Sequence, residues 1–179
     1  MGFGKEFLKV VAITTLARSG YSSLILHTEV VEVFQDYAKM QYKISPPFIT
    51  ANFTSTLDGF LVVGFEDKLC PGDVIILSYD RVPKIVDAYC NRYFRDSKPD
   101  YVYGGKNDWE ILSHKKLPNQ GWWIQVRRSL TTTDKPPLDF QFTKKKGLHW
   151  LSWAAHATQS DYSKFDSSFE GSTRAAQTR

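Results

Sequence analysis

The sequence predicts an all-β fold, an antiparallel β-sandwich. From position 38 onward, short apolar segments alternate with turn residues at the spacing typical of sandwich strands. Aromatic residues, which favour strands, make up 15% of the chain. In one segment Trp122, Ile124 and Val126 alternate with Trp123 and Gln125. This period of two places the first three side chains toward a core and the other two on the outer face.

Nine segments are predicted to be strands on this basis. Each is bounded by proline, glycine, aspartate or other turn residues. In chain order they are Ala38–Ser45, Phe48–Thr54, Gly59–Glu66, Asp73–Tyr79, Lys84–Cys90, Asp108–Ser113, Gly121–Arg128, Leu138–Phe142 and Leu148–Ala155.

A helical pattern occurs only before these strands, over Ser22–Tyr37. Leu26, Val30 and Val33 fall on one stripe there, at the spacing of an amphipathic helix. The polar residues after Gln159 show no pattern and predict an irregular tail. The expected organisation is therefore an N-terminal helical arm over 1–37, a sandwich over 38–158 and a polar C-terminal tail over 159–179.

The first twenty residues combine an apolar stretch with basic side chains. The stretch Phe7–Ala17 is shorter than the roughly 20 residues that cross a bilayer, so no transmembrane helix is expected. Lys5, Lys9 and Arg18 resemble the basic residues of a retained mitochondrial presequence, while Lys9 interrupts the apolar core of a secretory signal. We expect a mitochondrial location, with a secreted or extracytoplasmic location as the alternative. An exposed apolar set generally marks an interface, and the expected contact residues are Phe7, Leu8, Val11 and Leu16, together with the outward-facing Trp123.

Composition and motifs exclude several functions. The net charge of +4 is spread among acidic residues without a basic stripe, which argues against nucleic-acid binding. There is no GxSxG, HExxH or phosphate-binding glycine loop, so we expect no enzyme activity. No Cys/His ligand spacing is present, and no metal site is expected. Cys70 and Cys90 flank two consecutive predicted strands; a disulfide and two buried thiols both remain open.

Several acidic residues lie near one arginine of the predicted strands. Asp134 and Asp139 bracket two prolines and are expected to cap turns, or to form a buried polar anchor with Arg128. Asp108 and Glu110 are two residues apart and are expected to lie on one solvated strand edge. We interpret these residues as architectural rather than catalytic.

Six fragments, in order, resemble a known family. They are "GFLVVGFEDKL", "GDVIILSYD", "KIVDAYC", "NDWEILS", "GWWIQVRRSLTTTDKPPLDF" and "LHWLSWAAH". Together they resemble DOMON domains, the β-sandwich domains of dopamine β-monooxygenase relatives and cellobiose dehydrogenase. The resemblance runs from Met40 to His156 and implies a sandwich of immunoglobulin-like architecture.

The resemblance also implies where haem would bind. In haem-binding members a methionine before the Asp-Val-x-Val strand and a histidine after the Trp-Ala strand ligate the iron. This chain has Leu69 and Phe165 at those positions, and neither side chain coordinates iron. Met40, Cys70 and His156 are the substitutes to consider. The stretch "GFEDKLCPGDVII" is thus interpreted as a cofactor loop that has lost its ligand, with Leu69 and Phe165 packed together and no cofactor bound.

These observations predict a non-catalytic, haem-free DOMON-like accessory subunit. Its expected partners are other proteins of a large membrane-associated complex, such as a mitochondrial respiratory assembly. One alternative is an electron-transfer domain that binds b-type haem through substitute ligands. Another is an extracytoplasmic module that binds a sugar or other small ligand on a tryptophan platform formed by Trp109, Trp122, Trp123 or Trp150.

Overall fold

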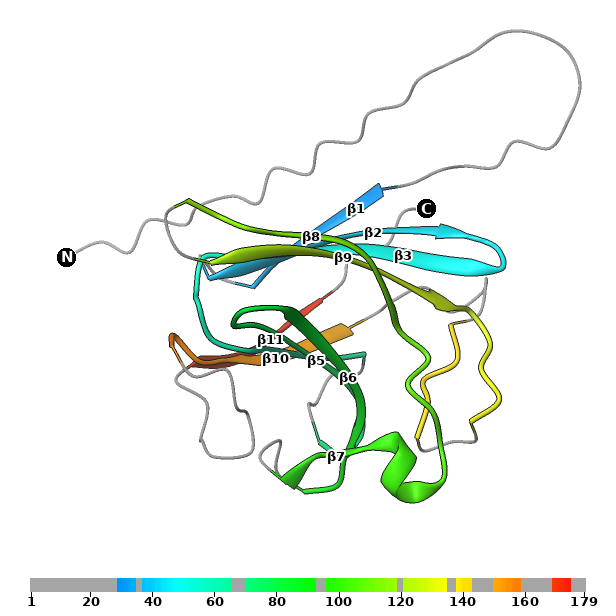
Figure 1. Cartoon of the computed structure of the whole chain (residues 1–179). Coiled ribbons are helices and arrows are strands. Elements are labelled where there is room, and N and C mark those ends of the chain that lie inside the picture. Colours follow the sequence, from blue (N-terminus) through cyan, green and yellow to red (C-terminus); the bar gives the residue numbers. More distant parts are fainter. Residues whose placement is uncertain are drawn as a thin grey trace, which may run out of the picture.

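Two antiparallel β-sheets face each other and enclose the core (Figure 1). The computed structural model describes residues 29–34, 37–65, 70–92, 96–118, 121–134, 138–142, 150–158 and 169–174, with the backbone alone for 29–34, 150 and 169–174. Within these residues the all-β sandwich predicted from the sequence is confirmed.

The first sheet has five strands, and its edge is extended by the segment before the predicted sandwich. Its strands lie in the order β1 (Glu29–Phe34), β2 (Ala38–Ser45), β3 (Phe48–Ser55), β9 (Trp122–Ser129) and β8 (Glu110–Lys116).

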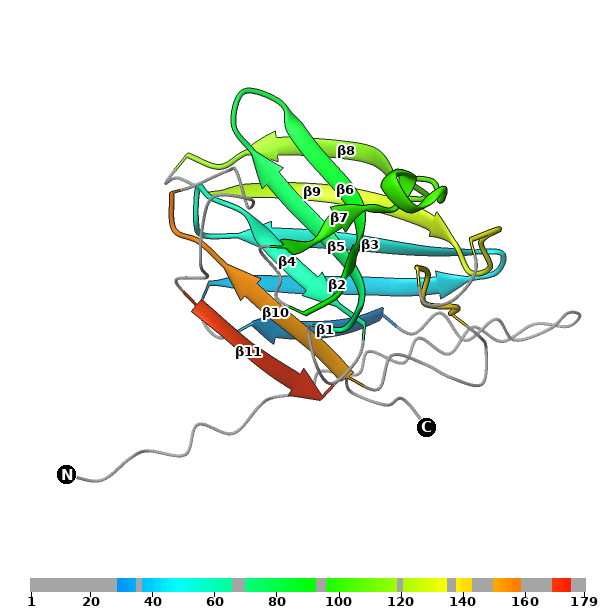
Figure 2. The same ribbon diagram turned by 90° about the horizontal axis from the view of Figure 1, so that it is seen from below.

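The second sheet has six strands and carries a short helix. Its strands lie in the order β11 (Phe169–Arg174), β10 (Trp150–Ala155), β4 (Leu61–Gly64), β5 (Gly72–Tyr79), β6 (Pro83–Cys90) and β7 (Lys98–Pro99). The 3-10 helix η2 (Asp100–Tyr103) follows β7 directly at one end of the sandwich (Figure 2).

The inner face of the first sheet follows the predicted register. Trp122, Ile124 and Val126 of β9 are fully buried, whereas Trp123 and Gln125 are half-buried on the outer face. Burial of the alternate apolar side chains accounts for the period of two, because successive residues of a strand point to opposite faces. The predicted inward set is therefore confirmed.

The second sheet is apolar on both faces. On its inner face Ile75 and Leu77 join the core between the sheets. On its outer face Val74 and Ile76 belong to a separate buried cluster, completed by Phe60, Val62, Ala88, Cys90 and Ala154. Residues 72–79 are consequently buried without alternation, and the sequence alone does not show which face each side chain takes.

The predicted N-terminal helix is wrong over residues 29–34. This part of Ser22–Tyr37 forms strand β1, which pairs antiparallel with β2 from Glu29↔Lys43 to Phe34↔Ala38. Valine favours strands, and a paired sheet edge satisfies the backbone hydrogen bonds of the segment. Residues 1–28 lie outside the described part of the chain.

The C-terminal tail is also not irregular throughout. Residues 169–174 form β11, which pairs antiparallel with β10 from Trp150↔Arg174 to Ala155↔Phe169. The two sheets thus extend beyond 38–158 at both ends. Parts of the predicted arm and tail therefore pair with this chain's own sandwich, at β1 and β11.

The predicted strand Leu138–Phe142 is absent. Its backbone is irregular, and the amide of Phe140 donates a hydrogen bond to Asp73 Oδ2 at 2.7 Å instead of to a neighbouring strand. The backbone hydrogen bond that a strand would make to its neighbour is made here to a buried carboxylate. The strand predicted at Asp108–Ser113 is shifted to Glu110–Lys116.

A disulfide joins Cys70 to Cys90, with their Cα atoms 5.2 Å apart. Cys70 lies just before β5, and Cys90 ends β6, where it is the register partner of Gly72. The hairpin therefore brings the two cysteines together, and the bond closes a 20-residue separation. Of the two possibilities left open by the sequence, the structure has the disulfide.

Candidate functional site

A buried cluster of charged residues replaces the apolar core at one end of the sandwich. Its centre is Arg128, which occupies an inward-facing position of β9 and is 1% exposed. Six carboxylates surround the cluster, and they belong to Asp73, Asp87, Asp100, Asp108, Asp134 and Asp139. Their segments are β5, β6, η2 and the loops next to β8 and β9, so the cluster joins distant parts of the sequence.

Arg128 connects the two sheets through ion pairs. Its Nη1 donates to Asp73 Oδ2 of β5 at 3.0 Å, and its Nη2 pairs with Asp139 Oδ1 at 2.8 Å. Nη2 also donates to the carbonyl oxygen of Phe140 at 3.2 Å. The rings of Trp109 and Phe142 lie 5.6 and 5.3 Å from the guanidinium carbon. Of the buried polar anchor expected from Arg128, Asp134 and Asp139, the pair of Arg128 with Asp139 is present. The half-buried Asp134 instead accepts the amide of Lys106, and Asp73 takes its place beside Arg128.

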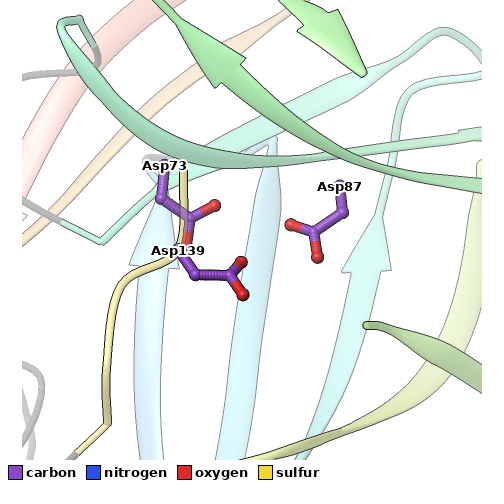
Figure 3. A group of neighbouring side chains, drawn as sticks. All are labelled: Asp73, Asp87 and Asp139. Atoms are coloured by element: carbon purple, nitrogen blue, oxygen red, sulfur yellow. The ribbon is translucent and has the colours of Figure 1, made fainter. Parts of the chain in front are cut away.

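Asp87 is a further buried aspartate of the cluster. Asp87 of β6 is 1% exposed; its Oδ2 accepts the amide of Asp108 at 3.1 Å, while its Oδ1 has no hydrogen-bond partner among the described residues. Figure 3 shows the carboxylates of Asp73, Asp87 and Asp139 turned toward one another. One oxygen from each of these three lies within 4.8 Å of the others. Arg128 lies against two of the three, so this group is already bridged by a cation.

A second group shares Asp139 and extends toward the surface. Oxygens of Asp100, Asp134 and Asp139 lie within 4.8 Å of one another. Asp134 is half-buried and accepts the backbone amide of Lys106 through Oδ2. The backbone of Gly105 passes close by, and a Cβ at that position would meet the carboxylate of Asp134. A side chain there would force that carboxylate to move.

Burial controls the protonation of the cluster. Burial and then the negative charge of Asp73 raise the pKa of Asp87 to about 9, and burial with the charges of Asp73 and Asp139 raises the pKa of Asp100 to about 8. The pKa of Asp73 is raised by burial to about 6, although Arg128 acts in the opposite direction. Burial would lower the pKa of Arg128, but the surrounding carboxylates, Asp73 first, raise it. One guanidinium does not balance this many carboxylates.

The structure differs from the sequence-based interpretation of Asp108 and Glu110. Asp108 is not on a strand edge with Glu110: it precedes β8, and burial raises its pKa. Glu110 is exposed and pairs with Arg127 at 2.7 Å on the outer face. Asp87 and Asp100 were not singled out at all. The signal for Asp87 was a charged residue within an apolar strand, "KIVDAYC".

The residues proposed as substitute haem ligands are dispersed. Met40 is fully buried in the core between the sheets. Cys70 is bonded to Cys90 and is unavailable as a thiolate. His156 follows β10, and its ring lies 5.9 Å from that of Phe60, a member of the outer cluster. The structure does not bring these three side chains together.

The other predicted site residues fall into two groups. Leu69, Phe165 and the apolar set Phe7, Leu8, Val11 and Leu16 lie outside the described residues. Among the proposed tryptophan platforms, Trp109 and Trp122 are buried. Trp123 is half-buried on the outer face, where Lys115 Nζ lies 5.8 Å from the centre of its ring.

Comparisons with known proteins give no relative: no family model, curated protein or solved structure matches this chain. The resemblance to DOMON domains therefore rests on the sequence fragments. No helix in the described part of the chain is long and apolar enough to cross a membrane.

We predict that Arg128→Met lowers the free energy of unfolding by about 3–5 kcal/mol, because it leaves buried carboxylates without their cation. The measurement is urea unfolding followed by tryptophan fluorescence. Arg127→Met is the matched control, since Arg127 pairs with an exposed carboxylate at the neighbouring position and should cost about 0–1 kcal/mol. Equal losses for the two variants would contradict the anchor.

We also predict that the free energy of unfolding falls as the pH rises from about 5 to 8. The measurement is made with EDTA present, so that no metal ion contributes to the stability. The folded-state pKa values of Asp87 and Asp100 are raised above the unfolded value, so the folded chain binds more protons in this window and loses stability as they dissociate. Asp87→Asn should make the slope shallower, because the amide does not ionise. Stability that rises over this window would show that these carboxyls are ionised in the folded chain.

Proposed function

We propose that this chain is a non-catalytic, haem-free β-sandwich subunit that acts through contacts with other proteins. The dispersal of the substitute ligands supports this proposal best. An axial pair must approach iron from opposite sides of one porphyrin. Met40 lies between the sheets, Cys70 is in a disulfide, and His156 packs beside the outer cluster. The electron-transfer alternative would need two of them at one site.

The chemistry of the buried cluster supports the absence of catalysis. Its groups are carboxylates around one arginine, and Arg128 is held by Asp73 and Asp139 on two sides. General acid–base catalysis requires a titrating group within reach of a substrate. Asp73, Asp87 and Arg128 are almost fully buried and instead connect strands β5, β6 and β9. We therefore assign them an architectural role.

Within the described part of the chain, we propose that the outer face of the first sheet contacts another protein. Trp123 is half-buried there, beside Lys115. On the same face Gln125 Nε2 donates to Asn52 Oδ1 at 2.9 Å across β9 and β3. An amphipathic ring among polar side chains is typical of protein contacts. The apolar residues of the N-terminal arm would supply the second contact.

The disulfide between Cys70 and Cys90 gives evidence on the cellular compartment in which the protein is located. A structural disulfide persists in oxidising compartments and is rare where thiols are kept reduced. This favours the extracytoplasmic alternative, and it restricts the mitochondrial proposal to the oxidising side of the inner membrane. A complex at a membrane surface remains compatible with both locations.

We predict that haemin added to the purified chain produces no Soret band of bound haem. The matched variant Leu69→Met with Phe165→His restores the two donors that DOMON haem proteins use and should gain a band of six-coordinate haem, read by absorbance. A defined band in the native chain would contradict the haem-free proposal. A variant that stays colourless would contradict the DOMON resemblance.

We further predict that deletion of residues 2–20 leaves the sandwich folded and reduces its recovery with partner proteins. Burial of the apolar set would contribute several kcal/mol to an interface, at roughly 25 cal/mol per Å². The melting temperature and the stoichiometry of complexes purified from the native source measure the two effects. An unfolded chain or normal assembly would contradict the proposed role of the arm.

A further inference from the structure

The carboxylates of Asp100, Asp134 and Asp139 come together from two segments of the chain. Asp100 begins η2, whereas Asp134 and Asp139 belong to the loop that follows β9. Oxygens of the three residues lie within 4.8 Å of one another, and Asp100 and Asp139 are buried. Like charges at this separation repel strongly away from water unless a positive charge or protons are present.

The hydrogen-bond donors and cations of the described residues do not satisfy all the carboxylate oxygens of this site. Asp100 is 0% exposed, and neither of its side-chain oxygens accepts a hydrogen bond from any residue that the structure describes. Asp139 is engaged already, because Arg128 Nη2 pairs with its Oδ1 and the Asp108 side chain lies within hydrogen-bond reach of its carboxylate. Buried polar atoms are nearly always hydrogen-bonded or bound to an ion. The two free oxygens of the fully buried Asp100 therefore point to a ligand.

We infer that Asp100, Asp134 and Asp139 form a binding site for a calcium ion. The donors are all oxygens, and three carboxylates suit a hard divalent cation. Calcium fits better than magnesium, because magnesium gives up its water shell reluctantly and two of these side chains are buried. Zinc would favour histidine or cysteine donors, which this group lacks.

The neighbouring group of Asp73, Asp87 and Asp139 is the weaker candidate. Arg128 already contacts two of its members, and a divalent ion beside the guanidinium would be repelled. The half-buried Asp134 instead gives the inferred site a side that an ion can reach from solvent. Asp139 belongs to both groups and also pairs with Arg128.

Calcium at this position would fasten η2 to the loop after β9. Two contacts prepare this arrangement: Lys106 donates its amide to Asp134, and Gly105 donates its amide to the carbonyl oxygen of Asp100 at 2.9 Å. The sequence does not indicate this site, because Cys/His ligand spacing is absent and the fold alone brings the three aspartates together. The inference goes beyond the proposed function, which concerns haem and protein partners. Calcium binding and haemin binding are measured in separate experiments, so either proposal can fail without the other.

The test uses the full chain after treatment with EDTA and dialysis. Titration calorimetry with CaCl₂ is expected to show one saturable site and an increase of the melting temperature, with weaker binding of MgCl₂. Asp134→Asn is expected to weaken calcium affinity at least about tenfold, since it removes a charged ligand. Asp134 is half-buried, so this variant should fold. Asp100→Asn is the second variant, and its folding is checked by circular dichroism.

Asp80→Asn is the matched control, because Asp80 is exposed in the turn between β5 and β6 and should leave calcium affinity unchanged. Absence of calcium binding by the native chain would overturn the inference and indicate that protons neutralise the cluster. Unchanged affinity in Asp134→Asn would place the ion elsewhere and would overturn it as well. Magnesium binding as tight as calcium binding would overturn the choice of ion.

Discussion

The ion pair between Arg128 and Asp73 is the interaction on which the arrangement of this end of the sandwich depends. Arg128 belongs to β9 of the first sheet and Asp73 to β5 of the second, and both face the space between the sheets. Both residues of the pair also hydrogen-bond to Phe140: Asp73 accepts from its amide, and Arg128 donates to its carbonyl oxygen. A loop without regular structure is thereby fixed across the end of the core. The segments that carry Asp87 and Asp139 also pack around this pair.

Part of this arrangement follows from the sequence and part does not. Alternation in β9 predicts its buried face, since one side of that strand is polar. In β5 both faces are buried, so alternation disappears, and nothing local shows that Asp73 faces inward toward Arg128. Asp87 lies in an equally apolar strand. Asp100 is brought to the cluster by a turn after β7, and this proximity depends on tertiary structure alone.

The errors at the two ends of the chain have one physical cause. Over residues 29–34 the spacing of apolar side chains fits a helix and a strand almost equally well, and pairing with β2 decides for the strand. Residues 169–174 contain little apolar surface, yet they pair with β10. In both segments, pairing with an existing sheet edge decides the structure where the local sequence pattern does not.

The central claim is that Arg128 and Asp73 stabilise the fold as a pair, and a double-mutant cycle tests it most directly. Free energies of unfolding are measured for the native chain, Arg128→Met, Asp73→Asn and the double variant. Each single variant leaves a buried group without its partner, whereas the double variant removes both, so the account predicts a coupling energy of about 2–3 kcal/mol. Additive losses, with a coupling energy near zero, would contradict it.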